Sequence, residues 1–142
     1  MADYTVNYSP TVYEVYVSDG GARTYSDLAV TAHNADATAH AIQVNAQTGT
    51  TYQLVLADAG KVVQCTNVNP IALTVPLNAT VAFAVGTVIG LRQGGAGLLT
   101  VAAAGGVTIN SLDSSLAMSG QYANAALEKT ATDTWALIGA LA

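Results

Sequence analysis

The chain of 142 residues is 51% hydrophobic but only 9% charged, with a formal net charge of −5. An ordinary soluble domain carries roughly 25% charged residues. The four cations are scattered, so the sequence offers no basic stripe for nucleic-acid phosphates or for an anionic membrane surface. They are Arg23, Lys61, Arg92 and Lys129. We therefore expect no nucleic-acid and no membrane partner. The weakly charged surface favours burial against other subunits over a free monomer.

The length suffices for one domain with its own core and a short arm. Cys65 is the only cysteine, which excludes an internal disulfide and a cysteine-based metal site. It follows an apolar run, which predicts a buried structural thiol instead of a nucleophile. The first residues lack the basic and apolar regions of a signal peptide, and prolines and asparagines interrupt the uncharged run between Lys61 and Arg92. We expect a soluble protein made in a cytoplasm.

Tyrosine is concentrated in the N-terminal region, residues 1–46. Five of the seven tyrosines lie there, namely Tyr4, Tyr8, Tyr13, Tyr16 and Tyr25. Residues 11–17 are dense in β-formers and predict a strand, which the turn sequence at 18–21 ends. Tyrosine offers a large rigid contact area with a polar tip, which suits an arm lying on a partner. The alternative is an edge strand packed on its own domain.

The rest of this region predicts two short strands, residues 28–31 and 39–44, around a turn at 33–36, and a brief helical turn near 25–28. His33, Asp36 and His40 suggest a metal site, but their spacing puts them in the turn and its flanks. No cysteine or glutamate lies nearby to complete a ligand set. We therefore expect solvated loop residues and no metal.

Residues 47–142 have the regular texture of a β domain. Short strands are predicted at 51–56, 61–66, 71–75, 80–93, 98–102, 107–109, 122–129 and 134–141. The first two and the last two are expected to form hairpins, and glycine turns follow at 94–97 and 105–106. Such spacing predicts an all-β fold, a compact sandwich or barrel-like antiparallel knob with a β-rich N-terminal arm.

The central stretch, residues 80–93, alternates apolar with small or polar residues. One face carries Val81, Phe83, Val85, Ile89 and Leu91. A period of two is the signature of strands with one buried face, and the two glycines inside the pattern mark a bend or bulge. Trp135 alternates in the same way in the last hairpin. We expect these residues to pack in the core or along a trimer axis.

Catalytic patterns are missing from the sequence. Most acidic residues lie in turns, where aspartate hydrogen-bonds the local backbone. Glu128 and Lys129 are expected to form a solvated charge pair at a strand end. None of the common hydrolase, nucleotide-binding or zinc-protease motifs occurs. The sequence therefore predicts a protein that is not an enzyme and that has no catalytic, cofactor or metal site.

Three segments together carry a family resemblance. T-Y-Q-L-V-L-A-D-A-G-K-V-V at 51–63, N-A-T-V-A-F-A-V-G-T-V-I at 78–89 and A-T-D-T-W-A-L-I-G-A-L at 131–141 resemble a module that recurs in structural proteins of tailed bacteriophages. The chain departs from that pattern at Leu77 and Ala84, where prolines are commoner, and it ends in G-A-L where G-D-L is usual. The resemblance covers about residues 48–142 and implies a virion structural protein, commonly trimeric.

Two virion locations fit such a module. The first is a capsid decoration (cement) protein on the outer head surface. Its partners would be its own copies in a homotrimer, the major capsid protein and other decoration proteins, with the tyrosines of the N-terminal region as capsid contacts. The second is a tail-fibre or receptor-binding component that presents the knob to host glycans. A small carbohydrate-active enzyme is the third reading, against which the missing site argues. We favour decoration, since the short chain has no shaft and Trp135 alternates like a core residue.

Overall fold

The computed structural model describes residues 6–9, 12–15 and 41–142. The chain divides into two compact units, residues 1–41 and 42–142. In the first unit, β1 (Val6–Ser9) and β2 (Val12–Val15) form an antiparallel pair. Strand β2 lies inside the strand expected at 11–17, whereas β1 was not expected. The unit boundary falls before the one expected at 46–47, because β3 joins a sheet of the second unit.

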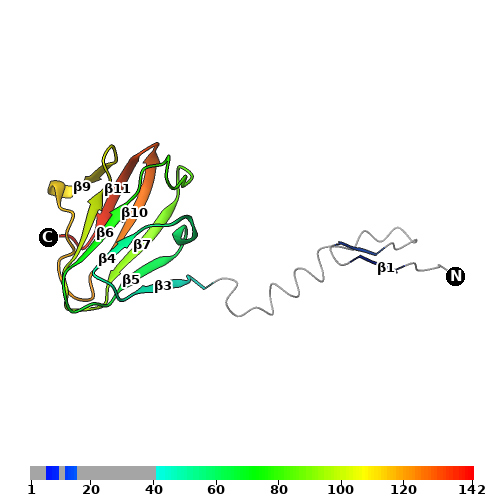
Figure 1. The fold of residues 1–142 in the computed structure, drawn as a ribbon, viewed down its shortest axis with the longest axis horizontal. Helices are drawn as coiled ribbons and strands as arrows, with labels where there is room; N and C mark the ends of the chain where they lie inside the picture. The colour runs from blue at the N-terminus through cyan, green and yellow to red at the C-terminus, as the bar shows by residue number, and fades with distance from the viewer. Residues whose placement is uncertain (1–5, 10–11, 16–40) are drawn as a thin grey trace. The chain divides into compact units, whose positions relative to one another are not determined.

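The second unit contains nine strands and two short 3₁₀ turns. The strands are β3 (Val44–Gln47), β4 (Thr51–Gln53), β5 (Val62–Cys65), β6 (Ile71–Val75), β7 (Val88–Gln93), β8 (Leu99–Ala103), β9 (Thr108–Ser111), β10 (Asn124–Ala131) and β11 (Thr134–Gly139). The 3₁₀ turns are η1 (Leu56–Asp58) and η2 (Leu112–Ser114). The expected all-β character is confirmed for residues 42–142 (Figure 1).

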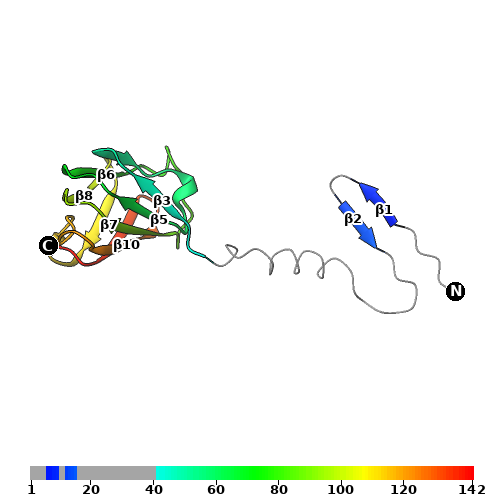
Figure 2. The ribbon, with the colours of Figure 1, turned by 90° about the horizontal axis from the view of Figure 1, so that it is seen from below.

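These strands form two sheets that the chain visits in turn. A six-stranded sheet has the order β3-β5-β7-β10-β11-β9, and a three-stranded sheet has the order β4-β6-β8. From β3 to β8 the chain crosses between the sheets after every strand (Figure 2). It re-enters each sheet in the same direction, so β3, β5 and β7 are parallel, and so are β4, β6 and β8.

The expectation of an antiparallel knob is therefore wrong for most of this unit. Strands β4 and β5, expected as a hairpin, belong to different sheets. Among these strands, antiparallel pairing is confined to β7 with β10 and to the expected hairpin of β10 with β11, while β9 runs parallel to β11. Two isolated antiparallel bridges also join Thr100 to Ala117 and Met118 to Leu141. A period of two reports which face of a strand is buried, and it is the same for parallel and antiparallel neighbours. The pattern could not identify the partner strands.

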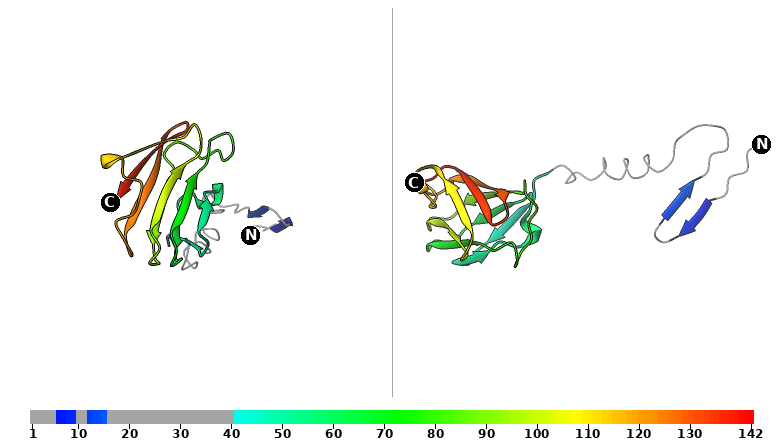
Figure 3. Two further views of the ribbon diagram at one scale, coloured as in Figure 1. Left: turned by 60° about the vertical axis from the view of Figure 1, so that its left-hand side comes forward. Right: turned by 90° about the horizontal axis from the view of Figure 1, so that it is seen from above.

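One core joins side chains from both sheets. Val63, Cys65, Ile89, Leu91, Leu127, Trp135 and Leu137 come from the six-stranded sheet, and Ile71, Leu73, Val75, Leu99 and Val101 from the three-stranded one. Leu54, Phe83 and Met118 complete the core from the connections. Full burial of one such side chain stabilises the fold by about 1.5–3 kcal/mol. Figure 3 shows the strands of this unit side by side in its left panel.

The stretch at 80–93 is a strand only in its second half, as β7. Before it the chain turns, since the N–H groups of residues 80 and 81 both donate to the carbonyl of Leu77 and Gly86 has φ +87°. Phe83, Ile89, Leu91 and Trp135 are buried, and Val81 packs against the core from its edge. Val85 is 63% exposed, so packing in the core is wrong for it, and packing along a trimer axis stays a prediction. The alternation of buried and exposed residues fails at Val85 because the chain turns before β7, so its side chain no longer points to the core.

The glycines at 94–97 form a corner between the two sheets, where a hairpin turn was expected. This corner stacks on the corner between β5 and β6, where the N–H of Gly97 donates to the carbonyl of Asn67 at 3.0 Å. The side-chain amide of Asn67 donates in turn to the carbonyl of Thr48, at 2.6 Å, in the corner between β3 and β4. A Cβ on Gly97 would lie 1.9 Å from the carbonyl oxygen of Asn69. Only glycine permits so close a stack.

Candidate functional site

A buried carboxylate lies where β3, β4 and η1 meet. Asp58 is 1% exposed, and its Oδ1 accepts a hydrogen bond from the side-chain amide of Asn45 at 2.7 Å. Its Oδ2 accepts from the hydroxyl of Tyr52 and from the N–H of Val55, both at 2.9 Å. Burial raises the pKa of Tyr52, and the neighbouring Asp58 raises it further. All three donors are neutral groups of the chain itself, so the cluster ties the segment from β4 to η1 onto β3.

A buried lysine forms the second polar cluster. The ammonium of Lys129, on β10, donates to Asn78 Oδ1 and, at 2.8 Å, to the carbonyl of Phe83. It also lies 5.8 Å from the centre of the Trp135 ring. The expected solvated pair of Glu128 with Lys129 is therefore wrong for the lysine. Lys129 is in register with Trp135 on the core side of β10, and only Glu128 points outward. Because Asn78 and Phe83 lie in the connection before β7, these hydrogen bonds hold that connection against β10.

The thiol of Cys65 is fully buried on β5. Burial raises its pKa to about 11, so the thiol stays protonated near neutral pH. The expectation of a buried thiol is confirmed.

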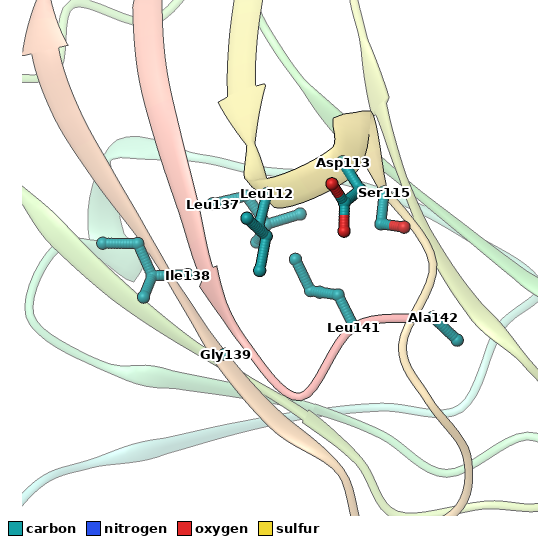
Figure 4. A pocket seen from close by; sticks show the side chains of 8 residues that line it. All are labelled: Leu112, Asp113, Ser115, Leu137, Ile138, Gly139, Leu141 and Ala142. Carbon is teal, nitrogen blue, oxygen red and sulfur yellow. The ribbon is translucent and has the colours of Figure 1, made fainter.

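A pocket of about 340 Å³ lies between η2 and the end of β11. Its lining is mainly apolar, and the residues are Leu112, Asp113, Ser115, Leu137, Ile138, Gly139, Leu141 and Ala142. Figure 4 shows the carboxylate of Asp113 beside Ser115 and across from Leu141. Asp113 has φ +53°, a left-handed conformation that aspartate tolerates. The lining includes no histidine, cysteine or lysine that could activate a nucleophile.

The outward face of the six-stranded sheet carries a straight row of apolar and small residues. The strand register aligns Val44, Val62, Gly90, Ala126 and Ile138 across β3, β5, β7, β10 and β11. We call these five residues the central row. Their strand neighbours Val63, Ile89, Leu91, Leu127 and Leu137 are buried in the core, so the row faces the other side of the sheet. Val44 is 52% exposed at one end and Ile138 is 60% exposed at the other.

Two charges flank the central row, one on each side. Arg92 lies two residues beyond Gly90 on β7, and Glu128 lies two residues beyond Ala126 on β10. Because β7 and β10 are antiparallel, the two charges lie on opposite sides of the row, on neighbouring strands. The guanidinium of Arg92 donates to Asn124 Oδ1 at 3.0 Å and to Gln64 Oε1 at 3.4 Å, which fixes it over the same face.

The expected tyrosine contacts lie in the first unit. Tyr8 on β1 and Tyr13 on β2 are directly paired in the hairpin register. Tyr4, Tyr16 and Tyr25 lie outside the described residues, as do His33, Asp36 and His40. Among the residues that the structure does describe, no three histidine, cysteine, aspartate or glutamate side chains are grouped as metal ligands. In that same part of the chain, no helix is long and apolar enough to cross a membrane.

Sequence reasoning missed the two buried polar clusters and the central row. Residues 57–60 separate the two strands of the expected hairpin, and their aspartate, Asp58, is the centre of one cluster. The row appears only when the strand register is known, because its members come from five separate strands. No known protein family, curated protein or solved structure matches this chain. The resemblance to phage structural modules therefore depends on the segments quoted above.

Proposed function

We propose that this protein is a capsid decoration (cement) protein of a tailed bacteriophage. In this proposal residues 47–142 form a compact sandwich-like knob, three copies assemble as a homotrimer on the outer head surface, and the tyrosines of residues 1–46 contact the major capsid protein. The bound protein bridges capsomers, and its interface area resists the pressure of packaged DNA.

The observation that carries the proposal is the resemblance of residues 48–142 to phage structural modules, together with the low charged fraction of the chain, 9%. Charge depletion with exposed valine and isoleucine is typical of surfaces that become buried in assemblies. Support also comes from the polar interior, because Asp58 and Lys129 contact the protein's own backbone and side chains and so act as scaffold.

Trp135 bears on the choice between head and tail. It is buried against Phe83, with ring centres 5.4 Å apart, and so cannot serve as a platform for a host glycan. One observation favours the alternative, a tail-fibre or receptor-binding component. Tyr122 is 73% exposed and has φ +70°, so an aromatic ring of the kind that stacks on sugars is accessible on the knob.

Copy number per virion tests the proposal. Quantitative mass spectrometry of purified virions, with the major capsid protein as internal standard, should give hundreds of copies of this chain. A few copies to a few tens would place it in the tail and contradict the decoration proposal. Light scattering of the purified protein should give three times the chain mass of 14.4 kDa if the homotrimer is correct.

Deletion of residues 1–24 tests the tyrosine contacts. This deletion removes β1 and β2 and leaves residues 42–142, a separate compact unit, unaltered. We expect the shortened protein to fold and to lose binding to expanded capsids. Replacing Tyr4, Tyr8 and Tyr13 by phenylalanine is the matched control, since it retains the rings and removes only the hydroxyls. Full occupancy by the deleted protein would refute the arm as the anchor.

A further inference from the structure

We propose that the outward face of the six-stranded sheet is a contact between two copies of this chain. The central row of one copy packs against the same row of the second copy, around a two-fold axis that runs along the row. Arg92 of each copy then faces Glu128 of the other. This contact is separate from the trimer and the capsid binding proposed above and does not depend on them.

The apolar row gives the contact its driving force. All five members of the row are apolar or small, Val44 and Ile138 are exposed at its two ends, and Val88 is exposed beside it on β7. A contiguous apolar stripe of this kind gains free energy when a second sheet covers it. In the middle of the row lie Gly90, which has no side chain and is partly covered by Val62, and Ala126, which has a single methyl group, so a second sheet can approach there. Two sheets that pack face to face with nearly aligned strands are a common arrangement in β proteins.

The two flanking charges select the occupant and its orientation. The two-fold rotation about the row places the Arg92 side of one copy over the Glu128 side of the other. The symmetry repeats this pair, so one contact contains two Arg92–Glu128 pairs. Viewed along the normal to the sheets, Arg92 of one copy and Glu128 of the other are offset by one strand spacing, about 4.8 Å. A guanidinium and a carboxylate can bridge that offset, and paired charges fix the register of a contact. The face is thus complementary to itself.

Other symmetric arrangements of this face are unfavourable. A three-fold axis parallel to the strands would bring each row against its equivalent rows, so Arg92 would meet Arg92 and Glu128 would meet Glu128. A two-fold axis parallel to the strands, between β7 and β10, would also bring the two arginines together. Like charges placed opposite one another destabilise a sheet contact. The charge pattern therefore favours the two-fold axis along the row.

The size of the face sets the expected strength. Five strands about 4.8 Å apart, with about five residues each at about 3.3 Å, give a footprint of roughly 400 Å². A standard stable interface buries about 800 Å² on each partner. We therefore expect a weak contact, with a dissociation constant on the order of micromolar, that forms and dissociates with concentration.

Sedimentation velocity over a concentration series tests the contact on the full chain. We expect the mass to double as concentration rises, starting from whichever oligomer is present when dilute. Ile138→Ser and Val44→Ser should each weaken the doubling about tenfold or more. Val68→Ser is the matched control, because Val68 is 76% exposed in the corner after β5, away from this face, and should have no effect. A mass that never doubles overturns the proposal.

A charge swap tests the two-fold axis itself. Arg92→Glu and Glu128→Arg should each weaken the doubling about tenfold, since each variant brings like charges together. The double variant Arg92→Glu/Glu128→Arg should restore it to within about threefold of the original. Circular dichroism melting checks that each variant is folded, because Arg92 also bonds Asn124 and Gln64. Singles without effect, or a double variant that fails to restore the contact, would overturn the arrangement. The starting mass tests the trimer independently.

Discussion

Replacing Asp58 by alanine should destabilise the protein by roughly 3–4 kcal/mol. The carboxylate is buried and accepts three hydrogen bonds, from Asn45, Tyr52 and the N–H of Val55. A hydrogen bond of this kind contributes about 1–1.5 kcal/mol net, and the donors left behind in a buried site have no equivalent partner. The sum is a large part of the stability of an ordinary domain of this size.

Urea unfolding followed by tryptophan fluorescence measures this change, because Trp135 is the only tryptophan and lies in the core. Asp58→Asn retains the shape but replaces one acceptor oxygen by a donor, so it should lose about half as much. Asp113→Asn is the matched control on an exposed aspartate and should change the free energy of unfolding by less than about 0.5 kcal/mol.

A double-mutant cycle locates the effect. Tyr52→Phe removes only the hydroxyl that donates to Asp58, so its cost should largely vanish when Asp58 is already alanine. The expected coupling is about 1 kcal/mol. If Asp58→Ala costs less than about 1 kcal/mol, or if the two changes are additive, the cluster does not hold the segment from β4 to η1 in place and our account of it is wrong.

Two further predictions concern the stacked corners and the buried thiol. Gly97→Ala should destabilise the fold by more than about 2 kcal/mol in the same urea assay, because its Cβ would collide with the carbonyl of Asn69. Gly105→Ala is the control, since a Cβ on Gly105 meets no atom within 4 Å. Equal effects of the two substitutions would refute the stacking argument. Because the pKa of Cys65 rises from 9.0 to about 11 on folding, its contribution to stability is complete below pH 9 and is lost as the pH rises toward 11, by up to about 3 kcal/mol. The free energy of unfolding of Cys65→Ala should therefore fall less over this interval than that of the unaltered chain, and parallel pH profiles would contradict the assignment.

The sequence alone predicted the all-β class and much of the core. Ile71, Leu73 and Val75 alternate in the sequence and are all buried on β6, and the last hairpin forms where a turn separates two apolar runs. Both features are local. A period of two identifies the buried face of a strand, and a short turn brings its neighbour alongside. Predictions of this kind need no knowledge of distant residues.

Tertiary structure decided which strands are neighbours and therefore what each face carries. The parallel pairing of β3, β5 and β7 joins segments that the chain leaves and re-enters by way of the other sheet, and no local signal records that path. Lys129 could be identified as a core residue only once its strand lay beside β11, with Trp135 next to it. The central row likewise exists only in the assembled sheet, because alternation assigns each residue a side but leaves its neighbours across the strands undetermined.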